Sequence, residues 1–172
     1  MYKLVAIDLD GTLLNSYGEV SEENKKMIKI ASSQGIYIVL ASGRTISSVE
    51  NLATEIGADK YIISGNGAVV YDFEKKEIIY NKFLTKKQVL EIAEICEANS
   101  IFYNVYSEEE IITKSLNYNV LFYHKENAKK NEEKRTKINI VQDIKKYVEN
   151  SDKENYLKII CKICMIWRLR IL

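Results

Sequence analysis

The sequence contains little cysteine and histidine, no proline, and almost no net charge. Three cysteines are too few for a disulfide scaffold in a chain of 172 residues, so we expect a reducing, cytoplasmic location. A net charge of +1 gives no basic or acidic excess, so we expect no nucleic-acid or membrane-surface partner. The single histidine, His124, lies in a polar segment and is expected to be exposed rather than catalytic.

Long apolar runs are also missing. The longest good one, residues 36–41, has the length of a strand and not of a membrane span. The N-terminal apolar run is short and is followed by Asp8 and Asp10, where the cleavage region of a signal peptide would be small and uncharged. The sequence therefore predicts one ordinary domain or two small ones, without a signal peptide.

The most informative stretch is residues 3–14, KLVAIDLDGTLL. Its run of Val and Ile without clean alternation predicts a strand that is covered on both faces of a parallel sheet. In open α/β sheets ligands bind beyond the carboxyl ends of the strands, where Asp8 and Asp10 would lie. If the extended geometry continues, both carboxylates point to the same side, which favours a bound Mg²⁺ shared with a phosphate. Gly11 permits a sharp turn, and Thr12 offers a hydroxyl. The alternative is an ordinary strand with an Asp-Gly turn.

The rest of the chain alternates strand and helix patterns, which predicts right-handed parallel crossover units. A first helix should begin after the N-cap Ser21 and run through Ser33, with Met27, Ile30 and Ala31 on one face and Gly35 as the stop. Further helices are expected at 46–56, 85–98, partly within 115–135, and at 143–150. Further strands are expected at 36–41, 61–63, 101–106, 111–114, 137–141 and 157–161, with a hairpin of residues 68–72 and 77–83.

Two further polar loops follow predicted strands. Ser42-Gly43-Arg44 follows the second strand, and its hydroxyl and N–H groups suit a phosphate that two carboxylates already face. Residues 64–68, SGNGA, follow the third strand and include Asn66. The alternatives are a helix-initiating Ser-Gly turn and a plain Asn-Gly hairpin turn.

The three motifs, in this order and at these strand ends, resemble the haloacid dehalogenase superfamily of phosphohydrolases, in particular its Cof-type subgroup (subclass IIB). The resemblance covers residues 1 to about 83. It implies a Rossmann-like α/β core at residues 1–83 and an inserted α/β cap at 84–172, both incomplete.

The resemblance also implies a chemistry. Asp8 would attack phosphorus, and Asp10 would act as the general acid and base. Mg²⁺ would be held by Asp8 and by the backbone carbonyl of Asp10. Ser42, with its neighbours Gly43 and Arg44, would bind the phosphoryl group, Asn66 would line the site, and the cap would select a small phosphorylated metabolite such as a sugar phosphate. The resemblance says nothing about the oligomeric state.

The sequence lacks the two motifs that the family pattern places after the cap. Gly67 is its last glycine, so the G-D-x-x-N-D loop of the family has no counterpart, and no later lysine stands in a recognisable context. We therefore expect the chain to stop inside the cap and the first strand to be left as an apolar edge. The alternatives to a phosphatase are a non-catalytic phosphate-binding module, a fragment completed by a partner, and a phosphomutase.

The last ten residues contain no acid and the only tryptophan, which suggests that residues 163–172 are out of frame. The alternative to an out-of-frame tail is a real C-terminal amphipathic segment. The C-x-x-C of Cys161 and Cys164 is weak evidence for a zinc or redox site. Sequencing the encoding DNA past the stop should reveal, in another frame, the rest of a cap and a G-D-x-x-N-D loop. Absence of both would contradict the hypothesis.

Overall fold

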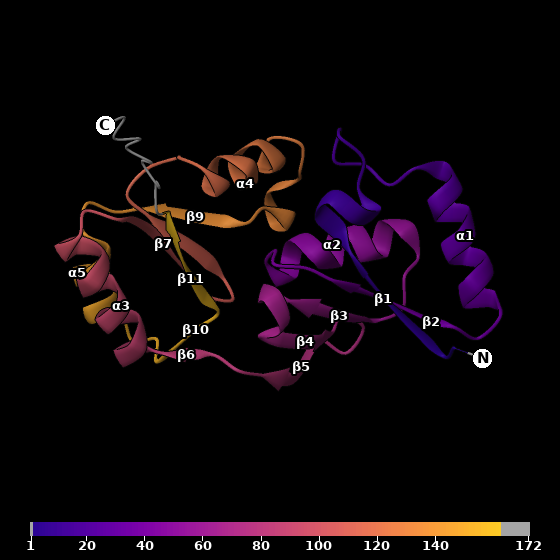
Figure 1. Ribbon diagram of the computed structural model, residues 1–172, viewed down its shortest axis with the longest axis horizontal. Coiled ribbons are helices and arrows are strands. Elements are labelled where there is room, and N and C mark those ends of the chain that lie inside the picture. The colour runs from indigo at the N-terminus through magenta and orange to yellow at the C-terminus, as the bar shows by residue number, and fades with distance from the viewer. Residues whose placement is uncertain (1, 163–172) are drawn as a thin grey trace, which may run out of the picture.

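The computed structural model describes residues 2–162, in which two larger β-sheets with their helices lie side by side (Figure 1). The prediction of an α/β fold is confirmed. The expected out-of-frame tail and Cys164 lie outside the described residues. Within those residues, no helix is long and apolar enough to cross a membrane.

The first sheet has the strand order β1-β2-β3-β4-β5. Its first three strands are parallel, β4 runs antiparallel to β3, and β5 runs antiparallel to β4. The strands are β1 (Leu4–Asp8), β2 (Tyr37–Ala41), β3 (Tyr61–Ser64), β4 (Val69–Asp72) and β5 (Glu77–Asn81). The predicted hairpin of β4 and β5 is confirmed, and the carboxyl ends of β1, β2 and β3 meet at one edge.

The helices α1 (Glu22–Ser33) and α2 (Ile46–Ile56) are the crossovers between the parallel strands. Both contribute to one hydrophobic cluster with β2 and β3, so they cover the same face of the sheet. This follows from the strand order, because two right-handed crossovers that move in the same direction place their helices on the same side. Ser21 caps α1 by accepting from the N–H of Asn24, as the sequence predicts.

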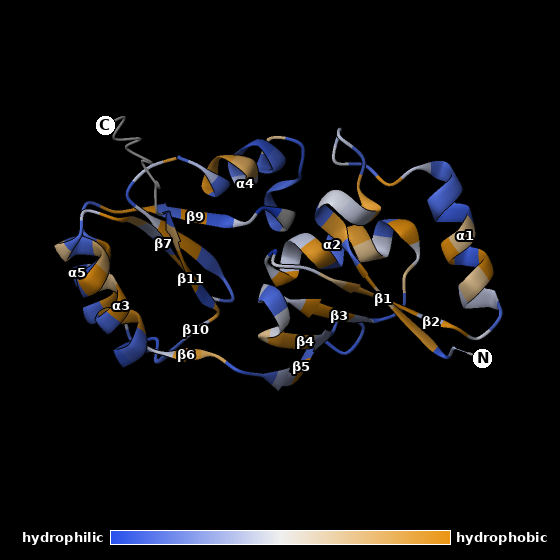
Figure 2. Cartoon of the chain, viewed as in Figure 1, coloured by the Kyte–Doolittle hydropathy of each residue, from blue (hydrophilic) through white to orange (hydrophobic). Residues whose placement is uncertain are grey.

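The predicted burial of β1 on both faces is wrong. β1 is the edge strand of the sheet, and Leu4 and Val5 are 53% and 40% exposed. Figure 2 shows it as a largely hydrophobic strand. A hydrophobic run predicts a buried strand only if a neighbour and two covering layers are present, and here β1 pairs with β2 alone. The expected apolar edge is confirmed among the described residues.

The apolar face of α1 that the sequence predicts is only partly buried. Ile28 is the buried residue of the helix, whereas Met27 is 59% and Ile30 39% exposed. The apolar residues of α1 span a wide arc, and only the part that contains Ile28 and Ala31 faces the sheet.

The second sheet has the order β11-β7-β8-β9, in which only β8 and β9 are parallel. A small antiparallel pair, β6 with β10, lies beside it and was not predicted. The bounds are β6 (Leu84–Thr85), α3 (Lys86–Ala98), β7 (Phe102–Tyr106), β8 (Glu110–Thr113), α4 (Asn119–Asn127), β9 (Lys137–Ile140), α5 (Ile144–Glu149), β10 (Asn155–Tyr156) and β11 (Lys158–Lys162). The predicted capping box of Thr85 and Gln88 begins α3.

The two faces of this second sheet pack differently. Tyr103, Val105 and Ile112 face α3 and α5 and form a cluster with them. The opposite face contributes Tyr106 and Ile111 to a cluster that also contains α4 residues and Val69 of the first sheet. We call the first sheet with α1 and α2 the first unit, and the second sheet with α3, α4 and α5 the second unit. The second unit therefore packs against the first through α4 and one face of its sheet.

Replacing Leu40 in the middle of β2 tests the core. Leu40 is fully buried, so Leu40→Ala should lower the free energy of unfolding by about 2–5 kcal/mol. Met27→Ala, on the exposed side of α1, is the control and should change it by less than about 0.5 kcal/mol. Urea denaturation followed by circular dichroism measures both, and equal effects would contradict the assignment of the core.

Candidate active site

Three loops meet at the carboxyl ends of β1, β2 and β3. Asp8 pairs with Ala41 across the sheet, and Ala41 pairs with Ile63. The loops that follow β1, β2 and β3 therefore begin next to one another at the same edge of the sheet. The N–H of Ser42 donates to the carbonyl of Ile63 at 2.9 Å, and the N–H of Asn66 donates to the carbonyl of Ser42 at 3.1 Å. The second and third loops are therefore joined by main-chain hydrogen bonds.

The loop after β1 is a short helical turn, Leu9–Leu13. Leu9 and Leu13 are buried and anchor the turn, while Gly11 has a φ of 82°, a conformation that favours glycine. The hydroxyl of Thr12 donates to Oδ2 of Asp8 at 3.2 Å. Because β1 ends at Asp8, the condition for two carboxylates on the same side, an extended strand through Asp10, is not met.

Asp10 contacts the guanidinium of Arg44. Nε of Arg44 donates to Oδ2 of Asp10 at 3.0 Å, and Nη2 donates to Oδ1 at 2.7 Å. This is the bidentate geometry in which Arg binds carboxylates best. Asp10 and Arg44, which come from different loops, are thereby held as one unit.

The same guanidinium contacts α4 of the second unit. Nη1 donates to Oε1 of Glu126 at 3.3 Å, and the guanidinium carbon lies 4.5 Å from the ring centre of Phe122. Burial alone would lower the pKa of Arg44, but the hydrogen bonds and charge of Asp10, followed by the charge of Glu126, raise it above its usual value. Arg44 therefore stays charged while it is only 7% exposed.

Two more contacts join the first unit to α4, one from the Arg44 loop and one from the first turn of α2. The N–H of Thr45 donates to the hydroxyl of Tyr123 at 3.3 Å, and the hydroxyl of Ser48 donates to Oε2 of Glu126 at 3.2 Å. Burial raises the pKa of Tyr123 to about 12, so its phenol is neutral at physiological pH.

Gly43 and Asn66 are in close contact. A Cβ at Gly43 would lie 2.5 Å from Oδ1 of Asn66, so any larger residue here would force the Asn66 side chain to move. Asn66 itself has a φ of 60°, a conformation that Asn adopts more readily than most residues. Asn66 lies beside the Ser42-Gly43 loop, as its predicted role requires, and that role stays a prediction.

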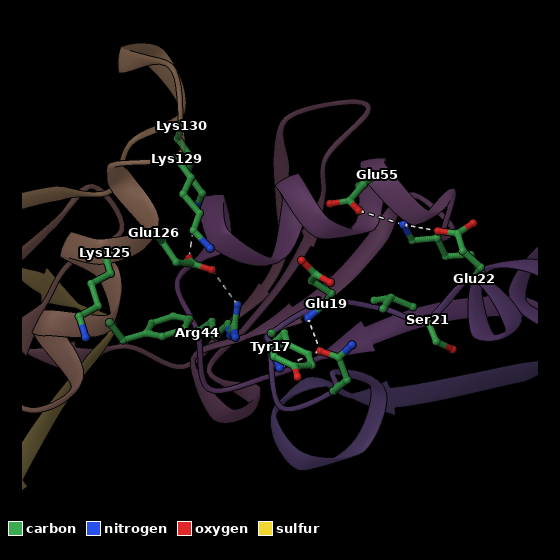
Figure 3. A pocket seen from close by; sticks show the side chains of 15 residues that line it. Tyr17, Glu19, Ser21, Glu22, Arg44, Glu55, Lys125, Glu126, Lys129 and Lys130 are labelled. Carbon is green, nitrogen blue, oxygen red and sulfur yellow. Dashed lines mark hydrogen bonds and ion pairs between the residues drawn. The ribbon is translucent and has the colours of Figure 1, made fainter.

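A pocket of about 660 Å³ opens beside Arg44, between α4 and the segment that leads into α1 (Figure 3). Lys125 and Glu126 lie on its α4 side, and Tyr17 and Glu19 lie on its other side. The pocket adjoins Asp10 through Arg44 and has the size of a small-metabolite site.

The predicted metal ligands are only partly arranged for an ion. Among the residues that the structure describes, no three His, Cys, Asp or Glu side chains gather around one point. Both oxygens of Asp10 accept from Arg44, whereas Asp8 has one oxygen without a hydrogen-bond donor in the described chain. One carboxylate suits Mg²⁺, which often takes one or two protein carboxylates and completes its shell with water and phosphate.

The sequence reasoning brought Asp8, Ser42 and Asn66 to one edge but missed the contributions of α4. Phe122, Tyr123 and Glu126 lie within a segment whose helical pattern is weak, and they approach Arg44 only through tertiary packing. His124 is exposed, as predicted. No local signal in the sequence marks Glu126 as a partner of Arg44.

Comparison with known proteins decides the family. The haloacid dehalogenase-like hydrolase family matches residues 5–168. The chain belongs to this family. The predicted resemblance is therefore confirmed, although the roles of the individual site residues are not tested by it.

Several members of the family resemble the chain over part of their length. Phosphatase YwpJ of Bacillus subtilis is 37% identical over 111 residues, which are 64% of this chain and 39% of that protein. The phosphatase YcsE of the same organism, named for 5-amino-6-(5-phospho-D-ribitylamino)uracil, is 41% identical over 70 residues, which are 41% of this chain and 28% of that protein.

Solved structures give the same result. A haloacid dehalogenase-like hydrolase from Bacteroides thetaiotaomicron has a TM-score of 0.65 at 31% identity and covers 84% of this chain and 53% of its own. One from B. subtilis has a TM-score of 0.71 at 26% identity and covers 90% of this chain and 59% of its own. The chain thus spans less than half of these curated relatives and little more than half of the solved chains.

The contact between Arg44 and Glu126 can be measured by a double-mutant cycle. Arg44→Met should lower the free energy of unfolding by about 1–3 kcal/mol, because it removes charged hydrogen bonds and leaves Glu126 without this partner. Glu126→Gln should cost less in the Arg44→Met background than alone. Lys125→Met on the same helix is the control. Additive effects of the two substitutions in urea denaturation would show that the contact is not formed.

Proposed function

We propose that the chain carries the nucleophile, phosphate loops and part of the cap of a Mg²⁺-dependent hydrolase of phosphate monoesters. The observation that supports this most is the meeting of Asp8, Ser42 and Asn66 at one edge of a parallel sheet in a chain of this family. Carboxylate, hydroxyl and amide groups at that edge are the groups that a transferring phosphoryl unit requires.

Asp8 is the nucleophile in this proposal. One of its carboxylate oxygens forms a bond to phosphorus while the bond from phosphorus to the ester oxygen breaks, which leaves an aspartyl-phosphate. Thr12 donates to the other oxygen and fixes the orientation of the carboxylate. Water then attacks phosphorus, which releases inorganic phosphate and restores Asp8.

Asp10 is the general acid and base. It gives a proton to the departing ester oxygen and later takes one from the attacking water. In the structure both of its oxygens accept from Arg44, so at least one of them must leave Arg44 before Asp10 contacts the substrate. Arg44, assigned to the substrate in the sequence, thus acts through Asp10 in this proposal.

Mg²⁺ would be held by Asp8 and by the backbone carbonyl of Asp10, and would supply positive charge beside the phosphoryl oxygens. The hydroxyl of Ser42 and the N–H of Gly43 would hold those oxygens from the other side, because the N–H groups of Ser42, Arg44 and Thr45 already have acceptors within the protein. The pocket beside Arg44, between α4 and the segment that leads into α1, has room for the rest of a small phosphorylated metabolite. The name of YcsE, a phosphatase for a ribityl phosphate, supports a polyhydroxylated substrate.

A fragment completed by a partner is the second candidate. The exposed apolar edge of β1 favours it, because an edge of this kind pairs readily with another strand. Turnover that appears only after addition of a polypeptide carrying the missing family motifs would support this candidate over a self-sufficient enzyme.

Turnover of a generic aryl phosphate tests the first candidate. The chain with Mg²⁺ should release phosphate, and Asp8→Asn should lower kcat by about a thousandfold or more because the amide cannot act as the nucleophile. Removal of Mg²⁺ with a chelator should abolish turnover. Asp152→Asn, at an exposed position of the second unit, is the control. Turnover that survives Asp8→Asn would contradict the assignment of the nucleophile.

A further inference from the structure

Lys158 is a partly buried cation whose two contacts are both neutral. It begins β11, and its Nζ donates to the main-chain carbonyl of Gly43. The ammonium also lies 4.6 Å from the ring centre of Tyr106. Among residues 2–162 no carboxylate lies within ion-pair distance of it. The charge of Lys158 is therefore not balanced by the described protein.

The backbone beside Lys158 is held firmly. The N–H of Leu157 donates to the carbonyl of Tyr106 at 2.8 Å, and Leu157 is 2% exposed. A Cβ at Gly65 would lie 2.7 Å from Cδ1 of Leu157, so this side chain fits against the loop that follows β3. Lys158 thus contacts the first unit from a strand whose backbone is held by packing and hydrogen bonds, and not from an exposed loop.

The ammonium of Lys158 contacts one of the loops that we propose bind phosphate. Gly43 follows Ser42 directly, and its Cα faces Oδ1 of Asn66. Lys158 therefore reaches the Ser42-Gly43 loop from β11 of the second unit. A group held between Ser42 and Lys158 would be covered by the cap.

Electrostatics favour an anion at this point. Burial lowers the pKa of Lys158 to about 8, because few groups around it stabilise the charged form. The phenols of Tyr106 and Tyr123 face this region from β7 and α4, and burial raises the pKa of both, so they stay neutral. Arg44 is the nearby cation of the same loop, and its charge is balanced by Asp10 and Glu126.

We propose that Lys158 is a substrate-binding residue contributed by the cap, whose ammonium binds an oxyanion of the phosphorylated substrate beside the Ser42-Gly43 loop. This rests on the proposed function, since the substrate is taken to be a phosphate ester. No covalent bond changes: the ammonium shares or exchanges its contact with Gly43 for one with the anion. The sequence reasoning gave no role to any lysine of the second unit.

Sulfate is a suitable probe, because it mimics a phosphoryl oxyanion and does not titrate at neutral or alkaline pH. Calorimetric titration of the full chain with sulfate should show binding that Lys158→Met weakens by about tenfold or more, the loss of one charge-assisted contact. Lys162→Met is the matched control, because Lys162 lies on the same strand, 5.1 Å from the Tyr118 ring, and is exposed. The control should bind sulfate like the unaltered chain.

The pH dependence separates a binding role from a structural one. As pH rises through about 8 the ammonium loses its proton, so sulfate binding by the unaltered chain should weaken. Lys158→Arg stays charged throughout this range and should bind sulfate with little dependence on pH. Urea denaturation of each variant shows whether folding has changed.

Two results would overturn the proposal. One is sulfate binding that is equal in the unaltered chain and Lys158→Met, or absent from both in tens of millimolar sulfate. The other is a Lys158→Met variant that unfolds more readily, together with a Lys158→Arg variant whose binding still weakens above pH 8, which would make Lys158 a tether between the units. Lys158-dependent binding without any Asp8-dependent turnover would instead contradict the proposed function alone.

Discussion

The structure depends most on the guanidinium of Arg44, which joins the acid loop to the second unit. It donates twice to Asp10, contacts Glu126, and stacks on Phe122 while it is almost fully buried. A buried cation of this kind is stable only because its carboxylate partners and hydrogen bonds offset the loss of hydration. The packing of α4 against the first unit and the position of Asp10 therefore both depend on the Arg44 side chain.

The parallel sheet supplies the rest of the site by topology. Strands that run in the same direction end at the same edge of the sheet. The loops that carry Asp8, Ser42 and Asn66 therefore lie next to one another because of the strand order. The same arrangement leaves β1 at the margin, with Leu4 and Val5 exposed. In the described chain Asp8, the proposed nucleophile, thus ends an exposed edge strand, which would link the stability of that strand to the chemistry.

Much of this could be predicted from the sequence, because strand and helix periodicity, the Ser21 and Thr85 caps and the three motifs are local signals. Burial of β1 could not, since it depends on which strands lie beside it. Which part of the apolar face of α1 is buried could not be predicted either, because that face is wider than the part that packs on the sheet. The contacts of Glu126 with Arg44 and of Lys158 with Gly43 depend on tertiary packing alone, and no local sequence pattern indicates them.

The central claim is that the carboxylate at the end of β1 accepts the phosphoryl group. It is tested most directly by acid-quenching the chain during turnover of an aryl phosphate with Mg²⁺ and analysing its peptides by mass spectrometry. The account predicts one added phosphoryl group on the peptide that contains Asp8, and none in Asp8→Asn. Turnover with no phosphoryl group on that peptide, or with one on a different residue, would contradict it.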